Sequence, residues 1–141
     1  FMYYPPERED LIQSGIQAIY LGDYVFWDHE RQTELLVNEY GWQEDTVEGT
    51  FKHYKSVECR MPGVHDHAKW VKRGFGRATD FASQDVRAGL MTREEGFAIA
   101  NKIDPMKPEA LKEYLELTGY TEEEFYDILK SQRVAKMRDL P

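Results

Sequence analysis

The sequence predicts an α/β chain in which a helix–strand–helix segment, residues 5–41, is followed after residue 63 by helices alone. A mostly apolar run, residues 16–21, lies between two segments with helix start and stop signals, which is typical of a short strand in an α/β domain. Beyond residue 63, apolar residues recur with helical spacing, and Thr-x-x-Glu capping patterns precede two segments. We therefore expect residues 1–62 to end an α/β domain with an incomplete sheet and residues 63–141 to form a helical region.

Residues 5–22 predict a helix and then a strand. The Pro5-Pro6 pair is followed by acids in the first helical turn, which suits the positive end of the helix dipole. Gly15 is a suitable C-cap for this helix. Residues 16–21 then predict the strand, which Gly22 stops.

The next two segments predict a helix and an ambiguous stretch. Asp28 is a good N-cap for a helix that Gly41 ends. Residues 46–57 fit either a strand or an extended excursion. Because one or two strands leave most sheet hydrogen bonds unmade, we expect the chain to be the C-terminal portion of a larger α/β enzyme. The alternative is a trimmed small helical protein.

Five helices are expected after residue 63. In the first, Val64, Ala68 and Val71 form an apolar stripe, and the Gly74-Phe75-Gly76 segment ends it. The expected segments are about 64–73, 79–90, 92–103, 111–118 and 121 onwards.

The composition excludes several classes of protein. With 26 acidic and 18 basic residues the net charge is −8, which argues against nucleic-acid binding by bulk charge. No apolar run approaches the roughly 20 residues of a membrane span, and no secretion signal begins the sequence. The single cysteine, Cys59, excludes an intramolecular disulfide. A cytoplasmic location is the expectation.

The basic residues are concentrated in residues 51–77, which we call the basic island. This segment indicates either a site for a small anion, such as a phosphate, or a solvated helix face that pairs with the acidic remainder. Its basic side chains are Lys52, Lys55, Arg60, Lys69, Lys72, Arg73 and Arg77, and its acids are Glu58 and Asp66.

Two carboxylates are candidates for ligand binding. Asp23 follows the expected strand, and ligands of open α/β sheets bind beyond the carboxyl ends of strands. Trp27 offers a stacking face nearby, although a β-turn with a core tryptophan is the alternative. Asp85 has apolar or small neighbours on its helix, so its carboxylate needs a partner. Arg77 or Arg87 would make a structural pair, and a ligand would make a site.

Metal binding and nucleophilic catalysis find little support in the sequence. Cys59, His65 and His67 do not have the spacing of a standard zinc site, so we expect no metal. No paired base is evident for Cys59, and the sequence contains no Gly-x-x-x-x-Gly-Lys phosphate loop. No catalytic residue is assigned.

An ordered set of short motifs resembles a known family over nearly the whole chain. In order and spacing they resemble the C-terminal part of the N-acetyl sugar amidotransferases of lipopolysaccharide O-antigen, pseudaminic-acid and legionaminic-acid biosynthesis. The most specific stretches are residues 15–28 and 72–96. The motifs are Tyr3-Tyr4-Pro5, Gly15-Ile16, Ile19-Tyr20-Leu21-Gly22-Asp23-Tyr24, Trp27-Asp28, Gly63-Val64, Lys72-Arg73-Gly74-Phe75-Gly76-Arg77-Ala78-Thr79-Asp80, Asp85-Val86-Arg87 and Met91-Thr92-Arg93-Glu94-Glu95-Gly96.

The resemblance implies a Rossmann-like PP-loop ATP pyrophosphatase fold, of which this chain is the C-terminal part. It implies conversion of a sugar acetamido group to an acetamidino group, with ATP and Mg²⁺, the phosphate loop lying outside this chain. It also implies a glutaminase with a cyclase-like companion that delivers ammonia, and the acidic C-terminal helices are the candidate docking surface. These acids are Glu113, Glu116, Glu122, Glu123, Glu124 and Asp127.

The site candidates are drawn from the basic island and from the residues that carry the resemblance. The expected substrate-binding residues are Asp23, Tyr24, Trp27, Arg77, Thr79, Asp80, Asp85 and Arg87, and the expected phosphate-binding residues are Lys69, Lys72 and Arg73. Two other functions stay open: another PP-loop ligase or sulfur-transfer enzyme, and a non-catalytic acidic helical domain that docks a partner.

Overall fold

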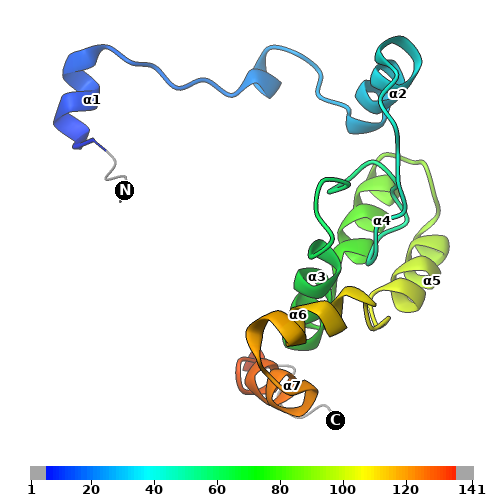
Figure 1. Cartoon of the computed structure of the whole chain (residues 1–141). Helices are drawn as coiled ribbons and strands as arrows, with labels where there is room; N and C mark the ends of the chain where they lie inside the picture. Colours follow the sequence, from blue (N-terminus) through cyan, green and yellow to red (C-terminus); the bar gives the residue numbers. More distant parts are fainter. Residues whose placement is uncertain (1–5, 136–141) are drawn as a thin grey trace. The chain divides into compact units, whose positions relative to one another are not determined.

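A computed structural model describes residues 6–135, which divide into two compact units. The first unit is Phe1–Gly41 and the second is Trp42–Pro141, and each is considered by itself. Figure 1 shows the order of the elements along the chain. This division at residue 41 differs from the domain boundary that we expect at residue 62. That boundary concerns the complete α/β domain and stays a prediction.

The first unit contains two α-helices and one short 3₁₀ helix within its described residues: α1 (Arg8–Ser14), η1 (Leu21–Asp23) and α2 (His29–Tyr40). The helix boundaries expected from Gly15, Asp28 and Gly41 are confirmed. Asp28 Oδ1 accepts the backbone N–H groups of Glu30 and Arg31 at 3.0 and 3.2 Å, which satisfies the first turn of α2. The C-caps Gly15 and Gly41 have the left-handed backbone conformation, with φ of 69° and 70°.

The expected strand at residues 16–21 is wrong for this chain. Residues 16–20 are extended coil that leads into η1, and no strand occurs within residues 6–135. Ile16, Ile19 and Tyr20 are 69, 66 and 83 % exposed. A strand requires neighbours for its backbone N–H and C=O groups, and no neighbouring strand is present in the described part of the chain. Residues 46–57, the second candidate strand, form turns and bends.

The second unit is helical, and the helices expected after residue 63 are confirmed. They are α3 (Pro62–Arg73), α4 (Arg77–Arg87), α5 (Arg93–Ile103), α6 (Ala110–Thr118) and α7 (Glu122–Ser131). Both capping boxes form: Thr92 and Glu95 begin α5, and Thr121 and Glu124 begin α7. The described structure is therefore a helical chain, which is compatible with the expected helical C-terminal portion; an α/β sheet is not part of it.

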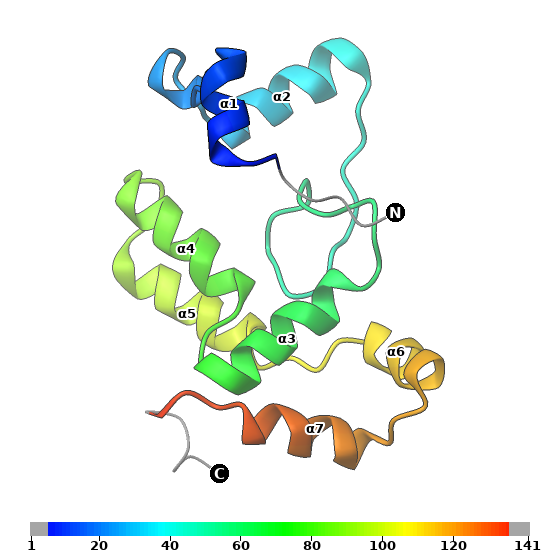
Figure 2. The ribbon, with the colours of Figure 1, turned by 90° about the vertical axis from the view of Figure 1, so that its left-hand side faces the viewer.

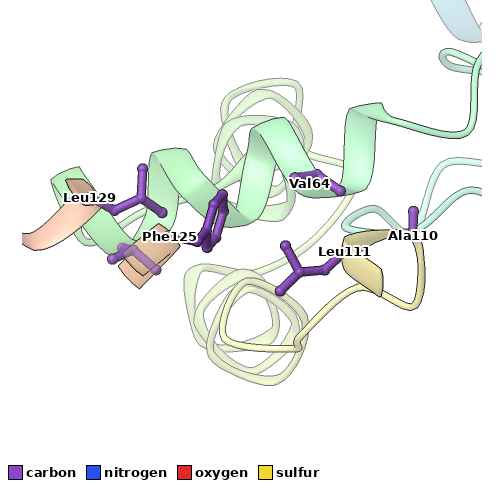
Figure 3. Packing of buried hydrophobic residues seen from close by; sticks show 6 residues of the cluster. Val64, Ala110, Leu111, Phe125 and Leu129 are labelled. Atoms are coloured by element: carbon purple, nitrogen blue, oxygen red, sulfur yellow. The ribbon is translucent and has the colours of Figure 1, made fainter. Parts of the chain in front are cut away.

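The hydrophobic core lies among α3, α6 and α7. Figure 3 shows Val64 of α3 close to Leu111 of α6 and Phe125 of α7. Leu111 is fully buried, and Val71 and Leu129 are 5 and 7 % exposed. The helical spacing of these residues along each element places one apolar face of each helix in the common core.

Helices α4 and α5 form a hairpin (Figure 2). Small residues make the contact between the two helices. Ala82 and Ala100 are buried, and Gly96 lies so close to α4 that an added Cβ would be 3.0 Å from Cγ2 of Val86. Small side chains let the two helices approach closely, which leaves the larger residues on both sides of the contact to form walls.

Candidate functional site

Three of the expected substrate-binding residues belong to the first unit. Asp23 ends η1 instead of following a strand. Tyr24 and Trp27 are 71 and 52 % exposed, and Trp27 makes an edge contact with the ring of His29 at 5.9 Å. Trp27 is therefore not the core residue of the alternative interpretation, and these three side chains are available for contacts.

Arg77 lies in a nearly buried polar cluster of the second unit. Its Nε is 2.6 Å from Oδ2 of Asp66, and its Nη1 donates to Oγ of Ser56 at 3.0 Å. The side chains of Arg77 and Asp66 are 17 and 7 % exposed, respectively. Lys55 lies close by, and its pKa is lowered by burial and by the charge of Arg77. These contacts join α3, α4 and the irregular segment that precedes them.

Asp85 pairs with Lys52, which corrects the expectation that Arg77 or Arg87 would be its partner. Nζ of Lys52 is 2.8 Å from Oδ2 of Asp85, and the two side chains are 12 and 10 % exposed. Arg87, two residues further on, points elsewhere: its Nη1 donates to Oγ of Ser83 at 2.5 Å. The buried carboxylate of Asp85 is therefore paired with a cation of the same chain. This agrees with the interpretation of Asp85 as one half of a structural ion pair.

The remaining cations of the basic island divide between ion pairs and helix ends. Lys69 forms an ion pair with Asp80 and lies over the ring of Phe75 at 4.6 Å. Arg60 pairs with Glu113 at 3.3 Å on the surface. Lys72 and Arg73 occupy the last turn of α3, where positive charge suits the helix dipole. The interpretation that the island pairs with acids thus holds for Lys52, Arg60, Lys69 and Arg77.

Asp104, which the sequence analysis does not identify, caps the N-terminus of α4. Its carboxylate accepts the backbone N–H groups of Gly76 and Ala78 at 2.8 and 2.9 Å, and the hydroxyl of Thr79 at 2.5 Å. A Cβ at Gly76 would be 2.6 Å from Oδ1 of Asp104. The hydroxyl of Thr79, an expected substrate-binding group, therefore serves the cap of α4.

An open groove of about 460 Å³ runs along the α4–α5 hairpin, and we call it the α4–α5 groove. Both helices line it with residues at i, i+3, i+4, i+7 and i+8, the spacing of one helix face. Gly74 and Phe75, which precede α4, complete the lining. The lining residues are Thr79, Ala82, Ser83, Val86 and Arg87 of α4, and Arg93, Gly96, Phe97, Ala100 and Asn101 of α5.

The groove has an apolar floor, and its walls combine polar with aromatic and aliphatic side chains. Its floor consists of the buried small residues Ala82, Gly96 and Ala100. Among its walls, Arg93 lies over the ring of Phe97 at 5.2 Å, and Phe97 is 56 % exposed. Apolar surface with a few converging hydrogen-bonding groups is typical of a small-molecule site, and the volume lies within the usual range.

A second cleft, of about 250 Å³, lies beside the N-terminal half of α3. Asp66 and His67 line it, and Nε2 of His67 lies 3.0 Å from the hydroxyl oxygen of Tyr126. Burial lowers the pKa of His67. Within residues 6–135 no three His, Cys, Asp or Glu side chains are grouped so that they could hold a metal ion.

Comparison with known protein families matches residues 48–138 to the family described as LPS biosynthesis protein WbpG-like, C-terminal domain. The match spans more than half of the chain. The chain belongs to this family. The resemblance to the C-terminal portion of a lipopolysaccharide biosynthesis family is thereby confirmed. No curated protein matches the chain.

The WbpG-like C-terminal domain includes the whole α3–α7 core, the polar cluster around Arg77 and the α4–α5 groove. Asp23, Tyr24 and Trp27 precede the matched residues. No helix in the described part of this WbpG-like chain has the length and apolar character that crossing a membrane requires.

Proposed function

We propose that the chain is the C-terminal portion of an ATP-dependent N-acetyl sugar amidotransferase of surface-polysaccharide or nonulosonic-acid biosynthesis. The observation that carries the proposal is the family match over residues 48–138, which names lipopolysaccharide biosynthesis. The sequence motifs that resemble sugar amidotransferases support the finer assignment. A cytoplasmic location belongs to the same proposal, because ATP and activated sugars are cytoplasmic compounds.

The reaction replaces the oxygen of a sugar acetamido group by nitrogen. An amide oxygen is a poor leaving group, so ATP with Mg²⁺ would activate it and ammonia would take its place. The residues of this chain do not fit an ATP-phosphate site by themselves. Lys69 is already paired with Asp80, and the sequence has no phosphate loop. The residues of this chain therefore have no assigned part in the activation by ATP.

The contribution of this chain is recognition of the sugar. The α4–α5 groove presents an aromatic ring, Phe97, beside the hydroxyl of Ser83 and the amide of Asn101. Aromatic faces contact the apolar side of a sugar ring, while hydroxyl and amide groups match its hydroxyl and acetamido groups. Holding the sugar in one orientation is how such residues would contribute to rate.

The reaction also needs a source of ammonia. The chain offers no glutaminase nucleophile, because its single cysteine, Cys59, is exposed and the sequence gives it no paired base. A glutaminase with a cyclase-like companion would supply ammonia. The acidic α6–α7 surface is only partly available as its docking site, since Glu113, Glu116 and Glu122 already form ion pairs within the chain. Rim charges that stay free would act mainly on the association rate.

The test is an assay of the complete enzyme with ATP, Mg²⁺ and an N-acetylated nucleotide sugar. Mass spectrometry of the sugar should show oxygen replaced by NH when ammonium chloride is present. Glutamine should support the same product only after the glutaminase and its companion are added. Absence of amidine under all of these conditions would refute the amidotransferase; use of glutamine by the purified enzyme alone would refute the partner requirement.

One observation favours a docking role as the second candidate. None of the described residues 6–41 is buried, although this segment contains a run of exposed apolar side chains at Tyr24, Val25 and Phe26. Contiguous exposed apolar residues mark interaction surfaces. If the complete protein binds a partner enzyme through this segment and turns over no sugar itself, the docking function replaces the catalytic one.

A further inference from the structure

His65, in the first turn of α3, lies beside the buried carboxylate of Asp66. Its Nδ1 is 3.1 Å from Oδ1 of Asp66, and the two side chains are 78 and 7 % exposed. An ionised carboxylate only accepts hydrogen bonds, so Nδ1 of His65 must be the donor. In the neutral ring this leaves Nε2 without a proton, and Nε2 has no hydrogen-bond partner among residues 6–135. The exposed imidazole can therefore accept a proton from a bound ligand.

The carboxylate that orients His65 is itself held in place. Nε of Arg77 is 2.6 Å from Oδ2 of Asp66, and Nη1 of the same guanidinium donates to Oγ of Ser56 at 3.0 Å. Ser56 has a φ of 59°, which no other residue except glycine approaches in the described part of the chain. Backbone strain of this kind persists only where surrounding contacts fix it, and it is common at functional sites. The contacts thus form a chain that leads from Ser56 through Arg77 and Asp66 to His65.

This arrangement is that of a general base. A buried carboxylate holds one ring nitrogen as a donor, and the other nitrogen is left to accept a proton. Arg77 already neutralises Asp66, so His65 is not needed to bury that carboxylate. The other two histidines of the second unit lack the combination. His67 is only 6 % exposed, and His53 is exposed but has no carboxylate partner within residues 6–135.

We propose that His65 is the general base of the reaction and that Asp66 and Arg77 are its positioning residues. This role rests on the proposed function, in which ammonia displaces the activated oxygen of the sugar acetamido group. The C–N bond forms at the acetamido carbon, the bond from that carbon to the activated oxygen breaks, and the oxygen leaves with the electron pair. One proton of the attacking nitrogen passes to Nε2 of His65 and from there to water.

NMR of the histidine ring nitrogens in the 141-residue chain tests the geometry without any turnover. At about pH 8.5, well above the ordinary range of imidazole titration, each neutral ring carries its proton on one nitrogen. A neutral histidine without a partner carries that proton mainly on Nε2. We expect His65 to carry it on Nδ1, and His53, the matched control in the same spectrum, to carry it on Nε2. A proton mainly on Nε2 of His65 would overturn the proposal.

Steady-state kinetics of the complete enzyme test the role. His65→Ala should lower kcat for amidine formation about a hundredfold or more, with little change in KM for the nucleotide sugar. The melting temperature should stay within about 2 °C, because the side chain is exposed. Added imidazole should restore part of the lost kcat, since a free base can take the place of the missing ring. His53→Ala, the control, should change none of these values.

The outcomes separate this proposal from the proposed function. Amidine formation by His65→Ala at the wild-type rate overturns the general base, while the amidotransferase stands. A loss of kcat that imidazole does not restore assigns a structural role to His65 and also overturns the proposal. Absence of amidine with the wild-type enzyme refutes the proposed function, and the role of His65 in it is refuted as well.

Discussion

Lys52 and Asp85 form an ion pair of 2.8 Å with only 12 and 10 % of their side chains exposed. The pair links the irregular segment before α3 to the last turn of α4. A carboxylate in this position is favourable only because a cation has been buried with it.

Replacement of Asp85 by alanine should destabilise the protein strongly, because Lys52 would stay buried without its carboxylate. We expect a loss of about 3–5 kcal/mol in the free energy of unfolding. Arg87→Ala, two residues away and exposed, should change it by less than about 0.5 kcal/mol. Urea unfolding of both variants measures the difference. Equal stability of the two variants would show that the pair contributes nothing.

Because Asp104 caps the N-terminus of α4 beside Gly76, the effects of substituting these two residues on stability should depend on each other. Asp104→Ala should cost about 2–4 kcal/mol, since three backbone N–H groups and the hydroxyl of Thr79 lose their acceptor. Gly76→Ala should also destabilise, because its Cβ would lie 2.6 Å from Oδ1 of Asp104. In the Asp104→Ala background, however, Gly76→Ala should cost much less. Strictly additive losses would contradict the close approach.

Sequence signals predicted the parts of the fold that depend on neighbours along the chain. Asp28, Gly41 and the two capping boxes define helix ends through contacts within five residues, so a local pattern is sufficient to find them. The pairing of Asp104 with Gly76 joins residues 28 apart, and no local pattern indicates it. The same limit applies to Lys52 as the partner of Asp85.

The strand expected at residues 16–21 shows the opposite case. Its residue types favour a strand, but a strand is stable only when other strands satisfy its backbone.

The sequence predicts part of the α4–α5 groove. Arg87 and Thr79 are expected site residues, and the i, i+3, i+4, i+7, i+8 spacing repeats in both helices. What sequence alone does not give is that these two helix faces meet.

Stability should decrease as the pH falls through the range in which His67 titrates. Burial lowers the pKa of folded His67 below the ordinary 6.5, so the unfolded chain takes up the proton first. The contribution of neutral His67 is thus fully present above about pH 6.5 and is lost as the pH falls below that value. Thermal unfolding from pH 7.5 to 5.5 measures it, with His67→Gln as the control, whose pH dependence should be weaker. A wild-type stability that rises toward pH 5.5 would be inconsistent with burial of neutral His67.

Removal of residues 1–41 should leave the second unit folded. The hydrophobic core cluster consists of residues between Val64 and Leu129, and no residue from 6 to 41 is buried. We expect the melting temperature of residues 42–141 to agree with that of the whole chain to within about 2 °C. A melting temperature lower by about 10 °C would mean that the first unit supports the core.

The most direct test of our account is the steady-state kinetics of the complete enzyme carrying Arg87→Ala. If the α4–α5 groove recognises the sugar substrate, KM for the N-acetylated nucleotide sugar should rise about tenfold or more, while KM for ATP stays unchanged. Arg60→Ala, in the same enzyme, should change neither constant. An unchanged KM for the sugar in Arg87→Ala, or an increase confined to KM for ATP, would contradict the account.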